Sequence, residues 1–82
     1  MPRKLKSNIS GVKLIKFFET NGFEIKRTKG SHIVLIRKIL SNDQILVIPK
    51  HKTVPRGTLK AIYRQATQYI SEEILSSQFY SD

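Results

Sequence analysis

The side chains best suited to chemistry in this sequence are two histidines, His32 and His51, which both lie among lysines and arginines. An imidazole exchanges protons near neutral pH, so one histidine can serve as a general acid or a general base. His32 ends the run Lys29-Gly30-Ser31-His32, in which the glycine permits close backbone approach and the serine hydroxyl and backbone N–H groups can bind an anion. A lone histidine at the start of a strand is more often structural, so both interpretations stay open at this point.

The sequence lacks the patterns on which most familiar enzyme classes depend. It contains no cysteine, which removes disulfides and thiolate metal sites. No acid lies close to either histidine in the sequence, which disfavours a metal site and a Ser-His-acid triad. Gly30-Ser31 is also too short for a phosphate-binding loop of the nucleotide-hydrolase type. We therefore expect no metal and no cofactor.

RNA cleavage needs only a small set of protein groups, because RNA carries its own nucleophile. The ribose 2′-OH can attack the neighbouring phosphate once its proton is removed, so the protein need supply only an acid or base and cations for the developing charge. His32 is the candidate acid or base. The residues expected to contact RNA are Lys26, Arg27, Lys29, Gly30, Ser31, Lys50, His51 and Lys52.

Charge is unevenly distributed along the chain. The formal net charge is +9, and all 15 Lys and Arg lie from Arg3 to Arg64, whereas three of the six acids follow Arg64. Such a field attracts polyanions and speeds their encounter, which favours a nucleic acid partner over a surface tuned only for solubility. No run of residues is long and apolar enough for a membrane span, so we expect a cytoplasmic protein with no membrane partner.

Hydrophobic periodicity predicts the elements that would position these residues. The period is helical after Ser10, two residues from Phe23 onward, and helical again after Pro55. Gly30 lies in a turn between the first two strands, where it is free to take a positive φ. The expected order is a basic arm over 1–9, a helix capped by Ser10 and closed at Asn21-Gly22, strands starting at Phe23, over 32–40 and over 44–48, a helix opened by Pro55 or Thr58, and a short helix capped by Ser71.

This order predicts an α+β fold, in which helices cover one face of a three-stranded antiparallel sheet. With 82 residues we expect one domain over residues 10–82, a flexible basic arm over residues 1–9, and a shallow surface site. The second and third strands are apolar on both faces, so the face without helices should contact a partner or a second copy. One face carries Ile33, Leu35 and Ile39, and the other carries Val34, Ile36 and Leu40.

Five short motifs occur in a distinctive order and spacing. They are SGVKLIK at residues 10–16, NGF at 21–23, KGSH at 29–32, IPKH at 48–51 and GTLKAIYRQA at 57–66. Each motif is weak alone, but together they resemble the HicA family of bacterial toxins, the YcfA-like mRNA interferases. The resemblance extends from about Ser10 to Leu75.

The resemblance implies both a fold and a function. Members have an α-β-β-β-α fold like that of double-stranded-RNA-binding domains, and they cleave mRNA without a metal. The histidine of their Gly-Ser-His motif is catalytic, and this role carries over to His32. A HicB-type antitoxin covers the active site in these type II pairs. The likeness to double-stranded-RNA-binding domains is one of shape and does not imply a preference for duplexes.

Two other hypotheses stay open from the sequence. One is a non-catalytic RNA-binding module of the same fold, in which Gly30-Ser31-His32 is only a hairpin turn. The other is an interaction protein that forms a homo- or hetero-oligomer through its apolar sheet face. The intact Gly-Ser-His favours the toxin, because a pure binder need not retain it. His51 can be a phosphate contact, a second acid or base, or a loop anchor, and we favour the contact or the anchor because the resemblance gives the catalytic role to His32 alone.

Overall fold

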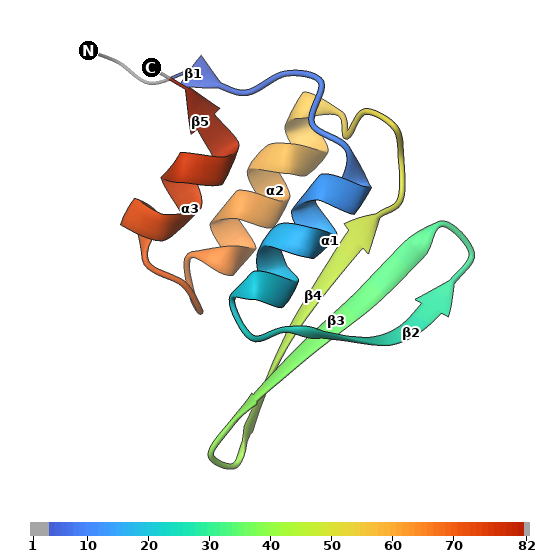
Figure 1. The fold of residues 1–82 in the computed structure, drawn as a ribbon, viewed down its shortest axis with the longest axis vertical. Helices are drawn as coiled ribbons and strands as arrows, with labels where there is room; N and C mark the ends of the chain where they lie inside the picture. Colours follow the sequence, from blue (N-terminus) through green and yellow to red (C-terminus); the bar gives the residue numbers. More distant parts are fainter. Residues whose placement is uncertain (1–3, 82) are drawn as a thin grey trace.

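The computed structural model describes residues 4–81 and confirms the predicted α+β fold. The helices gather on one side of a three-stranded antiparallel sheet of order β2-β3-β4, as in double-stranded-RNA-binding-like domains (Figure 1). A second, two-stranded sheet joins the chain ends. The elements are β1 (Lys4–Leu5), α1 (Gly11–Thr20), β2 (Glu24–Lys29), β3 (His32–Ile39), β4 (Asn42–Pro49), α2 (Arg56–Ala66), α3 (Glu72–Phe79) and β5 (Tyr80–Ser81).

Helix α1 begins and ends where the sequence predicts. The Ser10 side chain accepts a hydrogen bond of 3.1 Å from the backbone N–H of Lys13, which satisfies one of the free donors of the first turn. After the helix, Gly22 takes a φ of 94°, a conformation that glycine adopts without strain. The buried residues of α1 fall on one stripe that faces the sheet: Gly11, Leu14, Ile15 and Phe18.

The β2–β3 hairpin has the tight turn that the sequence predicts. Lys29 pairs with His32, so the loop contains only Gly30 and Ser31. Gly30 has a φ of 62° and is the first central residue, which is the pattern of a type II′ turn. Strand β4 is longer than expected, because Asn42 to Pro49 all pair with β3. The extra residues at its start are polar and outside the core, so hydrophobic alternation could not reveal them.

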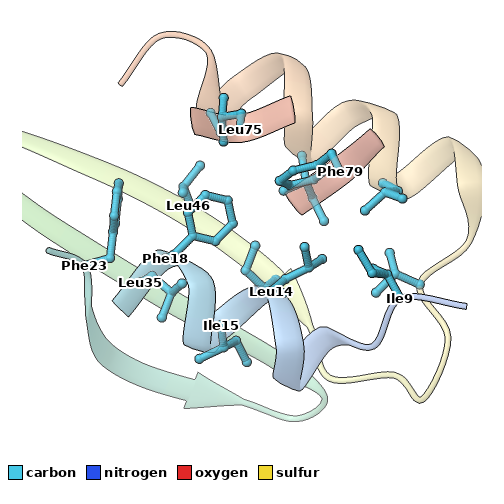
Figure 2. Close-up of a cluster of buried hydrophobic side chains, with 14 of the residues drawn as sticks. Ile9, Leu14, Ile15, Phe18, Phe23, Leu35, Leu46, Leu75 and Phe79 are labelled. Carbon is cyan, nitrogen blue, oxygen red and sulfur yellow. The ribbon is translucent and has the colours of Figure 1, made fainter. Parts of the chain in front are cut away.

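The core lies between the helices and one face of the sheet. Ile33 and Leu35 of β3 are 4% and 0% exposed, and the sheet is covered there by Phe18 of α1 (Figure 2). The Phe18 ring lies 5.8 Å from the Phe23 ring and 6.2 Å from the Phe79 ring, between centroids. These aromatic contacts join α1, the residue just before β2 and α3 into one hydrophobic core.

The described part of the expected basic arm packs against the domain. Strand β1 pairs with β5, and the Lys6 N–H donates a hydrogen bond of 2.8 Å to the Phe79 carbonyl. Leu5 and Ile9 are each 5% exposed and belong to the core. The expectation of a loose arm rested on the absence of periodicity, and two isolated apolar residues show no period although tertiary contacts bury them. Residues 1–3 of the expected arm lie outside the described residues.

Candidate active site

His32 is the first residue of β3, the central strand, and stands exposed at one end of the sheet, in a region that we call the His32 corner. Its neighbours across the strands are Lys29 on β2 and Pro49 on β4. Just beyond, the backbone N–H of Lys50 donates a hydrogen bond of 2.6 Å to the carbonyl of Ser31. The tight turn, the start of β3 and the end of β4 therefore hold the backbone around His32 in place.

Side-chain alternation places His32 on the face of the sheet that the helices do not cover. Ile33 and Leu35 point into the core, so His32 and Val34 project from the opposite, outer face. Directly opposite residues of antiparallel strands share a face, which puts Lys29 beside His32. The imidazole is thus open to solvent and has a cation as its cross-strand neighbour.

The end of β4 is held against the start of α1 by a glycine. The Gly11 N–H donates a hydrogen bond of 2.9 Å to the His51 carbonyl. A Cβ atom at this position would overlap the carbonyl oxygen of Pro49 and lie 3.0 Å from the Lys50 Cα. Only a residue without a side chain permits this approach, which fixes the loop after β4 next to the His32 corner.

The structure brings some of the predicted RNA contacts together and separates others. Arg27 pairs with Val34, so Arg27 and Lys29 share the outer face with His32. Lys26 lies at an irregularity between Ile25 and Arg27, a β-bulge at which alternation does not assign its face. Gly30 and Ser31 form the turn itself, and both are exposed.

The residues after β4 do not all turn toward His32. Lys50 lines a hollow between α1 and β2 together with Ile25, Thr28 and Ile33, so it lies on the helix side of the sheet. His51 and Lys52 are exposed in the following loop, and the His51 carbonyl accepts the Gly11 hydrogen bond described above. That bond joins the loop to α1, while the bond from the Lys50 N–H to the Ser31 carbonyl joins the end of β4 to the turn before His32.

The positive charge around His32 is not neutralised within the domain. Among residues 4–81, no side-chain ion pair joins a lysine or arginine to an acid, and the His32 imidazole has no hydrogen bond to a carboxylate. No cluster of three His, Cys, Asp or Glu side chains that could hold a metal occurs in the same range. The corner therefore offers an exposed imidazole and free cations, an arrangement suited to an anionic substrate.

Residues 11–67, well over half of the chain, match the family described as HicA toxin of bacterial toxin-antitoxin. The chain belongs to the HicA toxin family. The matched residues contain α1, the three-stranded sheet with His32, and α2. Searches among curated proteins and among solved structures gave no significant match. As a member of this family, the protein is the toxin of a toxin–antitoxin pair, which implies an antitoxin partner.

The outer face of this toxin carries an apolar patch next to His32. The patch is made of two cross-strand pairs, Val34 with Val47 and Ile36 with Ile45. Val47 is 43% exposed and Ile45 is 37% exposed, and no described element covers them. We call these four residues the outer patch. Its nearest member, Val34, is two residues from His32 on the same strand, so any protein that covers the patch also approaches the histidine.

Two further apolar residues, one at the end of β3 and one in the turn that follows, are exposed. Ile39, which the sequence grouped on one face with Ile33 and Leu35, is 42% exposed, because the β3–β4 hairpin extends past the helices (Figure 1). Leu40 is 97% exposed in the turn after β3 and has a φ of 57°. No element of the described chain covers either side chain.

In residues 4–81, no helix is long and apolar enough to cross a membrane.

One arginine of the toxin serves the fold instead of the surface. The Arg37 guanidinium donates hydrogen bonds to the side-chain oxygen of Gln44 at 2.7 Å and to the carbonyls of Asn21 at 2.9 Å and Tyr69 at 2.7 Å. It also lies 4.9 Å from the centre of the Phe23 ring. Arg37 thus joins the end of α1, the sheet and the segment after α2. A basic residue within a strand carries no sequence signal of this role.

Other cations that sequence reasoning overlooked lie on α2. Arg56, Lys60 and Arg64 are exposed along this helix, although only residues near the two histidines were expected to contact RNA. Their spacing of four residues was visible in the sequence and places them along one side of a helix. We call these three residues the basic stripe.

Proposed function

We propose that this toxin is a metal-independent endoribonuclease that cleaves mRNA, with His32 as its general acid or base. The observation that carries the proposal is the exposed His32 imidazole, with Arg27 and Lys29 on the same open face and no acid of residues 4–81 paired to either cation. Family membership supports the same conclusion, because the resemblance to HicA toxins implies mRNA cleavage by the histidine that corresponds to His32.

The proposed reaction is transesterification within the RNA backbone. The ribose 2′-oxygen attacks the adjacent phosphorus, the bond to the 5′-oxygen breaks, and the products are a 2′,3′-cyclic phosphate and a free 5′-OH. His32 removes the proton from the 2′-OH or donates one to the leaving 5′-oxygen, and water handles the other proton. Arg27 and Lys29 bind the phosphate and stabilise the extra negative charge of the phosphorane.

The other expected RNA contacts have supporting roles in this proposal. The Ser31 hydroxyl remains available for a phosphate oxygen, while the Ser31 carbonyl already accepts the Lys50 N–H. Gly30 leaves open space at the turn, since a Cβ there would meet nothing within 4 Å. Lys26, Lys50, His51 and Lys52 would add charge along the path of the strand.

The antitoxin of the proposed pair is of the HicB type, and it would bind the outer face. The outer patch is apolar, has no cover within residues 4–81 and lies next to His32. A protein seated on the outer patch would block RNA from the imidazole without contacting the core. The alternative is that the same face joins two copies of the toxin. In that case the purified toxin alone forms a dimer in solution, whereas an antitoxin site leaves it monomeric.

The decisive experiment is incubation of the purified protein with mRNA in EDTA, beside the variant His32→Ala. We expect cleavage by the wild type in EDTA, no cleavage by the variant, and unchanged RNA affinity in the variant. A 2′,3′-cyclic phosphate end on the product identifies the 2′-OH as the nucleophile. Cleavage that stops in EDTA, or that survives in His32→Ala, would refute the assignment.

A second function, RNA binding without cleavage, is favoured by one observation. The His32 imidazole has no carboxylate to orient it within the described residues. Under this alternative the wild type binds RNA and leaves it intact. His51→Ala serves as the matched control, since His51 is exposed on the neighbouring loop and should affect affinity without abolishing cleavage.

A further inference from the structure

The basic stripe on α2 is exposed and unpaired. Arg56, Lys60 and Arg64 lie on the side of α2 away from its buried residues, which are Leu59, Ile62 and Ala66. None of the three side chains forms an ion pair or a hydrogen bond within the described chain. Residues four apart rise about 6 Å along a helix, so the stripe is a regular row of positive charges about 12 Å long.

Two features of the charges of α2 oppose the stability of the helix: repulsion within the stripe and a cation in the first turn. Lysines and arginines four residues apart repel each other on a helix surface, and the basic stripe contains two such pairs. Arg56 also lies at the positive end of the helix dipole, and the first turn contains no acid. The preceding residue, Pro55, provides no side-chain hydrogen bond to cap the helix.

Helix α3 of the same chain has each feature that α2 lacks. The Ser71 hydroxyl accepts a hydrogen bond from the Ile74 N–H, and Glu72 and Glu73 occupy the first turn. Arg64, in the last turn of α2, complements the helix dipole, but folding alone does not explain Arg56 at the opposite end or the repulsion along the stripe. A polyanion bound along α2 would remove the repulsion and complement the helix dipole.

We propose that the basic stripe is a second RNA-binding surface, which holds the phosphates of a single strand that continues from the His32 corner. This inference rests on the proposed function, because it extends the path of the same substrate. The loop of residues 50–55 joins the end of β4, next to His32, to the start of α2 (Figure 1). Lys52 is exposed on that loop and would continue the charge between the two surfaces.

The geometry selects single-stranded RNA. His32 faces outward from the sheet, whereas α2 lies in the helix layer on the other side, so one molecule can reach both only by bending around the end of the domain. The longest extent of the domain is only 39 Å, so a path around its end bends sharply, which a flexible strand can follow and a stiff duplex cannot. A duplex would contact one surface at a time.

A hollow beside the basic stripe places an acidic side chain next to two of its cations. It has a volume of about 310 Å³, and Lys60, Arg64, Tyr80 and Glu72 contribute to its walls. The carboxylate of Glu72 would repel a phosphate bound on Lys60 or Arg64. Removal of that carboxylate should therefore strengthen RNA binding, the opposite of removing a lysine.

The test measures binding of labelled RNA to the full chain by fluorescence anisotropy, with His32→Ala in every variant so that no cleavage interferes. Lys60→Gln is compared with Lys38→Gln, an equal charge change at the far hairpin. For single strands the slope of log affinity against log salt is about −0.7 per phosphate contact, so we expect a roughly 5-fold loss at 0.1 M salt for Lys60→Gln. The variant with all three stripe residues changed to Gln should lose on the order of 100-fold and about 2 units of slope. Lys38→Gln should change affinity less than about 2-fold.

RNA length and thermal unfolding complete the test. A strand of about 4 nucleotides, which covers only the His32 corner, should bind His32→Ala equally well with and without the stripe substitutions, whereas a strand of about 16 nucleotides should bind the stripe variants more weakly. Lys60→Gln should raise the unfolding midpoint while it weakens RNA binding, and Glu72→Gln should strengthen RNA binding. Equal affinities for Lys60→Gln and Lys38→Gln would overturn the inference. A lower unfolding midpoint in Lys60→Gln would also overturn it. So would stripe variants that bind the antitoxin more weakly while their RNA affinity is unchanged, since the stripe would then bind an acidic protein.

Failure of this inference is distinguishable from failure of the proposed function. Catalysis is judged from wild-type cleavage in EDTA, and the basic stripe is judged from binding by variants that cannot cleave. If wild type binds RNA through the stripe but leaves it intact, the nuclease proposal fails and the stripe stands.

Discussion

Substitution of Gly11 by alanine tests how the His32 corner is held together. A Cβ atom at Gly11 would overlap the Pro49 carbonyl oxygen and lie 3.0 Å from the Pro49 carbonyl carbon and the Lys50 Cα. Favourable contacts between carbon atoms are about 3.5–4.0 Å, and these neighbours are backbone atoms that cannot move by changing a rotamer. The start of α1 must therefore move away from the end of β4, which also weakens the hydrogen bond from the Gly11 N–H to His51.

The size of the effect follows from two opposing contributions. Overpacking of this kind costs about 1–3 kcal/mol, and loss of a backbone hydrogen bond costs about 1 kcal/mol more. Alanine regains up to about 1 kcal/mol over glycine in a helix. We therefore expect Gly11→Ala to lower the free energy of unfolding by about 1–3 kcal/mol, which lowers the melting temperature by roughly 4 °C or more in a domain of this size.

Gly57→Ala is the matched control for Gly11→Ala. Gly57 also lies in the first turn of a helix, but a Cβ there would meet nothing within 4 Å. This control should stabilise the protein by up to about 1 kcal/mol. Urea denaturation of both variants at equal protein concentration provides the comparison. If Gly11→Ala were as stable as Gly57→Ala, the close approach of α1 to β4 would not be a constraint, and our account of the corner would be wrong.

Three further substitutions test separate features of the structure. Arg37→Met should cost about 2–4 kcal/mol in denaturant unfolding, because it leaves the carbonyls of Asn21 and Tyr69 without their donor; a loss below about 1 kcal/mol would show that these hydrogen bonds add little. Leu40→Asn should raise the unfolding free energy by about 1 kcal/mol, since Leu40 has a φ of 57° and a side chain that is 97% exposed; a drop in stability would mean that the leucine makes contacts absent from this structure. Val47→Glu should change the free energy of unfolding by less than about 1 kcal/mol, because Val47 is 43% exposed. It should weaken antitoxin binding at least 10-fold in calorimetry, because it places a charge in the apolar outer patch. Unchanged affinity would place the antitoxin elsewhere.

Much of the fold was predictable because its signals are local. Ser10 and Ser71 cap helices through hydrogen bonds to backbone N–H groups three residues away, and such contacts depend only on neighbouring residues. The turn at Gly30 likewise depends on the φ of one residue. The change of period from helix to strand determined the order of elements, and with it the position of His32 at the start of a strand.

The candidate site was only partly predictable. Sequence neighbours suggested that Lys50 would join Lys29 at His32, but Lys50 lies on the helix side of the sheet. Strand β3 is apolar on both faces, so the pattern alone could not decide which face the helices cover, and hence which way His32 points. The row of cations on α2 carried a visible spacing, but its exposure and lack of ion pairs became known only from the structure.

The sequence by itself determined which residues form helices, strands and turns around His32, because those choices depend on backbone preferences and on the nearest neighbours in the chain. The tertiary structure alone decided which surfaces meet. It placed Leu5 and Ile9 in the core, pressed Gly11 against Pro49, and left His32 on the open face of the sheet. The physical reason is that these contacts join residues far apart in the chain, and their existence depends on how all the side chains of the core pack together.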